Sequence, residues 1–161
     1  RSVSRGLGDV YKRQDIPRPG YAYYEQDLES RTFGVVVDTS GSMSAKQIGM
    51  ALGSIASYAA AKDVPFVRII FCDAKATDAG YLAPEDIAGR VKVTGRGGTI
   101  LQPGVDCLEQ ANDFPKDGPI LIITDGEIEN DLKVRREHAF LLPRGNRLPF
   151  RTRGEVFYFR E

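Results

Sequence analysis

Three short apolar runs limit the ways in which this chain can fold. They span residues 33–38, 66–72 and 119–124, and two of them close on or just before an aspartate, Asp38 and Asp125. Short apolar runs rich in β-branched residues are typical of strands buried on both faces of a sheet. When such strands alternate with helices, they form a mostly parallel sheet joined by right-handed crossovers. The expected fold class is therefore α/β, a doubly wound, mostly parallel sheet flanked by helices.

Helical periodicity separates these strands. Apolar residues recur at helical spacing between Ala45 and Ala61, which predicts a helix with one buried face. A second stripe of this kind runs from Leu101 to Ala111. The remaining expected elements are a short edge strand within 74–81, a short helix over 84–90 that begins with Pro84, and two final strands at 139–142 and 156–159.

The first thirty residues differ from the rest. Residues 4–14 (SRGLGDVYKRQ) resemble the translated adaptor of a transposase-based sequencing library, so we interpret residues 1–14 as an artefact that contributes nothing to the fold. Residues 15–30 are rich in proline, glycine and tyrosine and are typical of a connector. The domain is then expected at 31–161, with native sequence missing upstream of Asp15.

Composition argues against several classes of protein. The chain has 22 basic and 22 acidic residues, which argues against a nucleic-acid binder that relies on bulk charge. It shows no secretory signal and no apolar run near the ~20 residues that cross a bilayer. Cys72 and Cys107 lie far apart, so we expect free thiols in a reducing, cytoplasmic compartment. Four arginines near the C-terminus are interpreted as a solvated loop, with a local binding patch as the alternative: Arg144, Arg147, Arg151 and Arg153.

Oxygen-bearing side chains gather around the ends of the expected strands. Asp38 and Asp125 each follow a buried strand, so both are expected at the sheet edge where carboxyl ends meet and ligands bind. Two close carboxylates repel each other unless a positive charge lies between them. An all-oxygen set suits Mg²⁺, Mn²⁺ or Ca²⁺ rather than Zn²⁺. The candidate metal ligands are Asp38, Ser40, Ser42, Thr99 and Asp125.

A simpler alternative for the first of these loops is helix capping. Ser42 or Ser44 would then cap the following helix, and Asp38 would be a turn residue. The two roles are compatible, because one serine can cap while another binds a metal.

Further polar residues flank the same loops. Asp73 follows the second strand and could support the metal ligands from behind or cap a turn. Three acidic residues after Asp125 could ring the metal, although a solvated acidic turn is favoured for them. His138 is expected at the entry to a strand, without a ligand role. The three acidic residues are Glu127, Glu129 and Asp131.

The motifs D-T-S-G-S at 38–42 and T-D-G at 124–126, with Thr99 between them, resemble the metal-ion-dependent adhesion site of the von Willebrand factor A (VWA) family. The resemblance extends over about residues 32–159. It implies that the two serines and Thr99 bind the metal directly, and that the two aspartates bind directly or through water. It also implies a protein-binding module, in which an acidic side chain of the partner completes the metal coordination.

A narrower resemblance rests on Phe71-Cys72-Asp73, the glycine-rich loop at 95–99 and the T-D-G motif. These features are similar to a bacterial VWA-like family found downstream of metallopeptidase-like domains and often encoded beside AAA+ ATPases. An AAA+ ATPase or a metallopeptidase-like domain is therefore a candidate partner. The chain has no H-E-x-x-H motif, so a peptidase-like part would lie elsewhere.

The function expected from the sequence is a divalent-metal-dependent protein-binding module that is not an enzyme. One alternative is a metal-dependent hydrolase that uses the same cation to activate water. No His, Lys or Cys is well placed in the sequence as its general base. A second alternative is a structural adaptor with an empty site. We expect no nucleic-acid or membrane partner.

Overall fold

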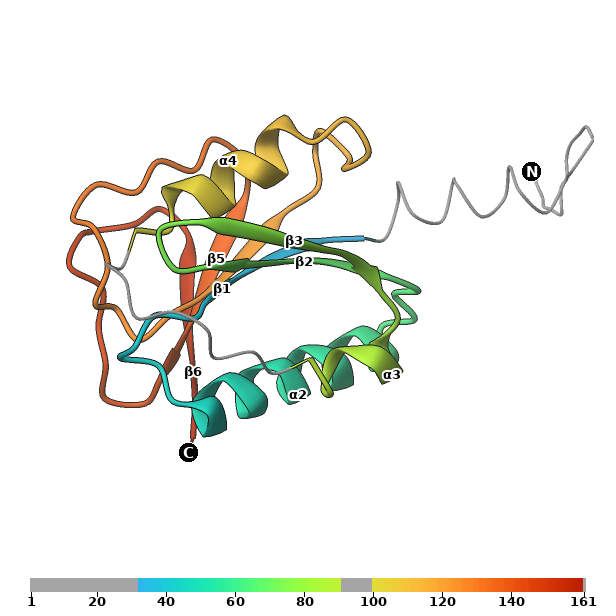
Figure 1. Cartoon of the computed structure of the whole chain (residues 1–161), viewed down its shortest axis with the longest axis horizontal. Coiled ribbons are helices and arrows are strands. Elements are labelled where there is room, and N and C mark those ends of the chain that lie inside the picture. Colours follow the sequence, from blue (N-terminus) through green and yellow to red (C-terminus); the bar gives the residue numbers. More distant parts are fainter. Residues whose placement is uncertain (1–31, 91–99, 161) are drawn as a thin grey trace, which may run out of the picture. The chain divides into compact units, whose positions relative to one another are not determined.

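Residues 32–90 and 100–160 are described in the computed structural model, and they contain a six-stranded sheet with helices on both faces (Figure 1). The strand order is β3-β2-β1-β4-β5-β6, and every neighbouring pair is parallel except β2 with β3. This confirms the expected α/β class. The strands are β1 (Gly34–Asp38), β2 (Val67–Cys72), β3 (Ala76–Leu82), β4 (Ile120–Ile123), β5 (His138–Pro143) and β6 (Glu155–Phe159).

Residues 1–31, 91–99 and 161 lie outside the described residues. They include the adaptor-like segment, the connector and Thr99, so the predictions made for these parts stay predictions. All the elements described below belong to the unit Phe33–Glu161.

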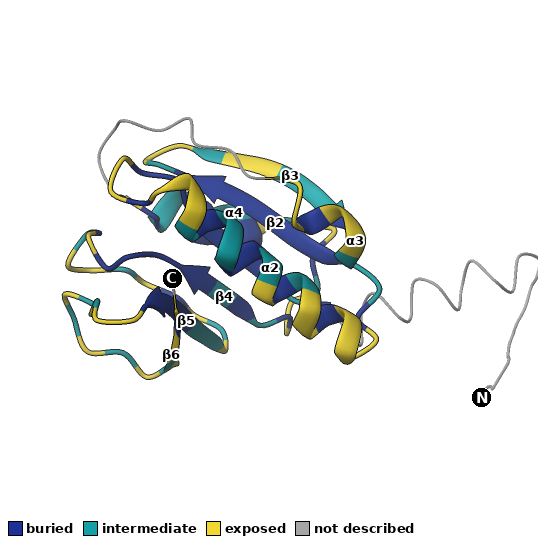
Figure 2. Ribbon diagram, turned by 90° about the horizontal axis from the view of Figure 1, so that it is seen from below, coloured by how far each residue is buried: buried dark blue, intermediate teal, exposed yellow. Residues whose placement is uncertain are grey.

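Strand β1 lies at the centre of the sheet and packs against the core on both faces. All five of its residues are buried. Val35 and Val37 pack in the core beneath helix α2 (Ala45–Ala61), whereas Val36 packs in the core beneath helix α4 (Gln102–Gln110). Figure 2 shows β2 and β4 as largely buried ribbons, and α2 as a helix that carries both buried and exposed residues. The strand must therefore be apolar on both faces.

Helix α2 begins and ends where the sequence predicts. Its N-terminus carries a capping box, in which the backbone N–H of Gln47 donates to Ser44 Oγ at 3.1 Å and that of Ser44 donates to Gln47 Oε1 at 3.0 Å. Ser44 is therefore the cap, and Ser42 is not. The buried face consists of Ile48, Ala51, Leu52, Ile55 and Ala59.

Two details differ from the sequence prediction. Helix α3 (Pro84–Ile87) is shorter than the expected 84–90, and Gly89, a poor helix former, lies just beyond it. Strand β2 is not purely apolar, because buried Arg68 pairs with Asp78 on β3 and with Asp113 beyond α4, at 2.5 and 2.8 Å. This hydrogen-bonded pairing holds the pKa of Asp78 below its usual value.

Both cysteines are free thiols, as expected, and burial raises the pKa of Cys72 and of Cys107. Within the described ranges, none of the helices is long and apolar enough to pass through a membrane.

Helix α4 can approach the sheet closely because Gly104 faces it. A Cβ atom at this position would lie 2.8 Å from Val36 Cγ1 and 3.1 Å from Cys72 Cβ. Both neighbours are short side chains on central strands, so neither can move away easily. Gly53 in α2 is different, because a Cβ atom there would meet nothing within 4 Å.

We expect Gly104→Ala to destabilise the fold by about 1–3 kcal/mol through overpacking. Gly53→Ala is the matched control and should stabilise by about 0.5–1 kcal/mol, because alanine favours a helix. Urea denaturation measures both free energies of unfolding. Equal stabilisation by the two substitutions would show that α4 is not packed against β1 as closely as described.

Candidate metal centre

The sheet topology brings the first and third predicted loops together. Strands β1 and β4 are parallel neighbours, with Val37 opposite Ile123. The next residues along each strand, Asp38 and Thr124, therefore leave the sheet side by side. Their side chains are in direct contact, because Thr124 Oγ1 donates to Asp38 Oδ2 at 2.7 Å.

Asp38 is a buried carboxyl group with hydrogen-bond donors but no counter-charge among residues 32–90 and 100–160. Its Oδ1 accepts the backbone N–H of Ser40 at 2.9 Å, and its Oδ2 accepts the Thr124 hydroxyl. Burial raises the pKa of Asp38, and the negative charge of Asp125 adds to this. The bonds from Ser40 and Thr124 act in the opposite direction. A cation at this position would relieve both causes of the raised pKa.

The two predicted serine ligands lie next to each other. Ser40 Oγ and Ser42 Oγ are 3.0 Å apart, with Ser40 buried and Ser42 exposed. A tight turn in which the backbone N–H of Met43 donates to the Ser40 carbonyl at 3.0 Å brings them together. Adjacent ligands of an octahedral Mg²⁺ ion are about 2.9 Å apart, given its usual bond lengths. The hydroxyl spacing suits a shared cation as well as a simple hydrogen bond.

Asp125 lies in a tightly held loop. Its Oδ1 accepts the backbone N–H of Glu127 at 3.0 Å, and its carbonyl accepts Asn146 Nδ2 at 2.8 Å. The next residue, Gly126, has φ +92°, and a Cβ atom there would lie 2.1 Å from the Arg147 carbonyl oxygen. Glycine is required here both for its positive φ and for this close approach.

The side chains at this edge offer oxygen donors, which are of the kind that a hard divalent cation prefers and zinc does not. Within 32–90 and 100–160, no three His, Cys, Asp or Glu side chains are grouped so that they could hold a metal ion. Asp38 and Asp125 alone do not form such a group, so the predicted site would also need the serine hydroxyls. Such neutral and anionic oxygens suit Mg²⁺, Mn²⁺ or Ca²⁺. The fifth predicted ligand, Thr99, lies outside the described residues.

The structure corrects the interpretation of Glu129 as part of a solvated acidic turn. Its carboxylate accepts the backbone N–H of Leu101 at 2.7 and 2.9 Å and that of Gln102 at 3.1 Å. Helix α4 begins without a side-chain cap from Leu101, so a carboxylate 28 residues away satisfies its free N–H groups. Glu127 and Asp131 are exposed, in agreement with the solvated interpretation.

The contacts of the other two flanking residues are local, and because that of Asp73 does not involve its carboxylate, both roles expected for this side chain stay predictions. The backbone N–H of Asp73 donates to the Lys75 carbonyl at 3.3 Å, within the turn that follows β2. His138 begins β5, as expected, and its Nδ1 lies 2.8 Å from the Arg136 carbonyl. It is therefore at the opposite end of β5 from the loops that hold the aspartates.

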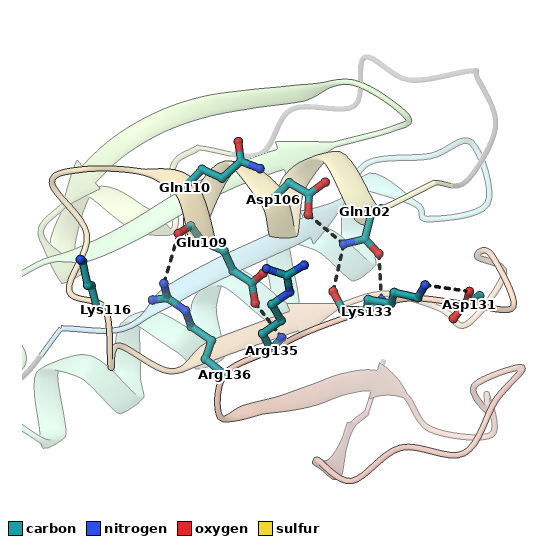
Figure 3. Close-up of a pocket in the computed structure, with 9 residues that line it drawn as sticks. All are labelled: Gln102, Asp106, Glu109, Gln110, Lys116, Asp131, Lys133, Arg135 and Arg136. Carbon is teal, nitrogen blue, oxygen red and sulfur yellow. Dashed lines mark hydrogen bonds and ion pairs between the residues drawn. The ribbon is translucent and has the colours of Figure 1, made fainter.

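A hollow of about 680 Å³ beside α4 is a weaker candidate site (Figure 3). The Gln102 side chain pairs with both backbone groups of Lys133, at 2.8 and 2.9 Å, and Glu109 accepts the backbone N–H of Arg135 at 2.8 Å. Arg136 donates to the Pro115 carbonyl. These hydrogen bonds hold the segment before β5 against α4. Because the polar groups named here already have partners within the chain, the hollow is a weaker candidate for a ligand site.

Sequence reasoning missed two residues of the site region. Thr124 was part of the T-D-G motif, but nothing in the sequence indicated that its hydroxyl donates to Asp38. Asn146 lies in a distant turn and shows no signal beyond a residue type common in turns.

We expect Asp38→Asn to melt at least as high as wild type in EDTA at neutral pH, because the amide removes a buried negative charge. Its Oδ1 can still accept the Ser40 N–H, and its Nδ2 can donate to Thr124 Oγ1 in place of accepting from it. The folded-state pKa of Asp38 is raised, so wild type loses stability as pH rises from the unfolded pKa through the folded one. The advantage of the variant should therefore shrink on acidification. Thermal denaturation across this pH range measures it. A variant that melts lower at neutral pH would contradict the charge argument.

The family described as VWA-like domain (DUF2201) matches residues 33–135 of the chain. The matched residues include β1 to β4, the D-T-S-G-S turn and the T-D-G loop, and they stop before β5. No curated protein matches the chain.

Proposed function

The chain belongs to the VWA-like domain family (DUF2201), and on this premise we propose that it is a protein-interaction module whose contact with its partner depends on a divalent cation. The observation that carries the proposal is the buried contact between Asp38 and Thr124. It joins the D-T-S-G-S and T-D-G motifs around a carboxyl group that has no counter-charge within the described residues.

The proposed ligands are Asp38, Ser40, Ser42 and Asp125 from the described residues, together with Thr99. This set supplies five oxygen ligands at most, so a six-coordinate cation keeps at least one position for water or another ligand. A carboxylate from the partner would take that position in a charge-assisted contact. Mg²⁺ is the preferred ion, with Mn²⁺ or Ca²⁺ as substitutes.

We propose binding rather than catalysis for this site. The single histidine of the chain, His138, begins β5 at the far end from the aspartate loops. Cys72 is buried and has a raised pKa. Neither residue is placed as a general base for the hydrolase alternative.

The partner is proposed from the narrower sequence resemblance to bacterial VWA-like proteins. An AAA+ ATPase or a metallopeptidase-like domain, in a bacterial cytoplasm, would then present the acidic side chain. The free thiols of Cys72 and Cys107 are compatible with that compartment.

Ser42→Ala and Ser44→Ala form a matched pair that tests the metal site. Ser42 is exposed and contacts Ser40, whereas Ser44 only caps α2. We expect Ser42→Ala to weaken Mg²⁺ or Mn²⁺ binding by about tenfold or more and to leave the metal-free stability almost unchanged. Ser44→Ala should lose about 1 kcal/mol of stability and keep its metal affinity.

Isothermal titration calorimetry and thermal denaturation in EDTA measure these two quantities. Equal metal affinity in all three proteins would remove Ser42 from the site. If wild type itself takes up no Mg²⁺, Mn²⁺ or Ca²⁺, the structural-adaptor alternative replaces the proposal.

Thr99→Ala tests whether the partner binds through the metal, because it removes one neutral ligand and keeps both aspartates. We expect capture of a partner from a source lysate to fail in EDTA and to weaken in Thr99→Ala. Capture that survives both changes would show that the cation is not the contact. Metal-dependent hydrolysis of phosphate esters by wild type, lost in Ser42→Ala, would favour the hydrolase alternative.

A further inference from the structure

We propose that the segment after β5, together with Tyr158 near the end of β6, forms a basic shelf beside the loops of the proposed metal site, and that this shelf binds a second acidic side chain of the partner. The shelf consists of Arg144, Arg147 and Tyr158. The inference rests on the proposed function, because it identifies the partner segment as one with at least two acidic groups.

Sheet order places the shelf next to the metal loops. Strands β1, β4 and β5 are parallel neighbours, with Ile123 opposite Leu141, so their carboxyl ends lie along one edge. Asp38 ends β1, the T-D-G loop follows β4, and the turn with Arg144 follows β5. The shelf lies beyond residues 33–135, so the inference depends on this chain's own geometry.

The turn that carries the arginines is held by one hydrogen bond within it and by another to β6. The backbone N–H of Asn146 donates to the Pro143 carbonyl at 3.1 Å, and Gly145 has φ +95°. The backbone N–H of Arg144 donates to the Phe159 carbonyl at 2.9 Å, which fastens the turn to β6. The two arginines therefore extend from a tight turn with a fixed backbone.

Two contacts join this turn to the proposed metal loop. Asn146 Nδ2 donates to the Asp125 carbonyl at 2.8 Å. The backbone of Gly126 passes against the Arg147 carbonyl so closely that a Cβ atom would lie 2.1 Å from it. The metal loop and the shelf thus share a continuous backbone surface.

The shelf surrounds an open hollow, and none of the described residues that line it is acidic. Its volume is about 540 Å³, and it is lined by Arg144, Gly145, Asn146, Arg147 and Tyr158. Tyr158 is 52% exposed, and among residues 32–90 and 100–160 no carboxylate forms an ion pair with either arginine. A guanidinium group can bind a carboxylate through two parallel hydrogen bonds.

The charge balance favours an acidic protein segment as the occupant. A bound divalent cation would offset the charges of Asp38 and Asp125. Exposed Glu127 follows Asp125 on the same loop, but the hollow itself is lined by Arg144 and Arg147 and, among the described residues, by no carboxylate. A partner carboxylate on the cation brings the neighbouring residues of the partner over this basic surface. A nucleic acid or a free phosphate would need only the arginines, so the experiment must distinguish it.

The test is an NMR titration of ¹⁵N-labelled full chain in Mg²⁺ with synthetic Gly-Ser peptides that carry either one glutamate or two glutamates at varied spacing. We expect the best two-glutamate peptide to bind roughly three- to fivefold more tightly than the one-glutamate peptide, a gain typical of exposed ion pairs. The double variant Arg144→Ser/Arg147→Ser should lose this gain and still bind Mg²⁺ and the one-glutamate peptide.

The matched control is Arg151→Ser/Arg153→Ser, which removes the same charge at the other end of β5. Gly154 packs against His138 there, a strand length of roughly 17 Å from the shelf. The control should keep the gain. Loss of the gain in both double variants would indicate a non-specific charge effect and overturn the inference.

Two further outcomes separate the inference from the proposed function. If the one-glutamate peptide binds only with Mg²⁺ but the second glutamate adds nothing, the shelf is wrong and the metal contact stands. If neither peptide binds in a Mg²⁺-dependent way, both fail. Inorganic phosphate or a short oligothymidine that displaces the two-glutamate peptide, and loses affinity in Arg144→Ser/Arg147→Ser, would make the shelf a phosphate site instead.

Discussion

The hydrogen bond from Thr124 to Asp38 is the contact on which the proposed metal site depends most. It joins side chains 86 residues apart in the sequence, which the parallel pairing of β1 and β4 brings side by side. Burial of a carboxyl group is costly unless hydrogen bonds or an opposite charge compensate. The fold supplies hydrogen bonds from Thr124 and Ser40, but among the described residues it supplies no positive charge. On the proposed function, a bound cation would compensate for this buried carboxylate, which is the physical basis of the proposed site.

Most of the fold could be predicted from the sequence because its signals are local. The capping serine and the apolar stripe define α2, and three buried runs define the central strands. Arg68 shows where local reasoning fails. Arg68 lies in a strand whose other residues are apolar, and one of the carboxylates that accept its hydrogen bonds belongs to Asp113, 45 residues away. Only the folded chain reveals that partner.

The candidate site likewise contains some contacts that the sequence predicts and others that it does not. Asp38, Ser40 and Ser42 lie within one short motif, so their proximity follows from the sequence. The sequence predicted that Glu129 is solvated, whereas its carboxylate accepts backbone N–H groups 27 and 28 residues away. Every residue type except proline has a backbone N–H, so a sequence pattern cannot indicate such a partner. Asn146 escaped notice for the same reason, since its partner is the carbonyl of Asp125.

These contacts also bear on specificity. Two hydrogen bonds join the loops after β1, β4 and β5: one from Thr124 to Asp38 and one from Asn146 to Asp125. The proposed cation and the basic shelf would therefore lie at a fixed distance from each other. Each exposed contact between an arginine and a carboxylate contributes only about 0.2–1 kcal/mol. A partner carboxylate that met only an arginine, without the metal contact, would therefore be held weakly. Two acidic groups at the matching spacing would bind together, and a partner with the wrong spacing would leave one of them unpaired. On the proposed function, the contacts that hold the Asp125 loop against Asn146 and Arg147 would fix the spacing of acidic groups that a partner needs. Binding of such a partner would also require the cation.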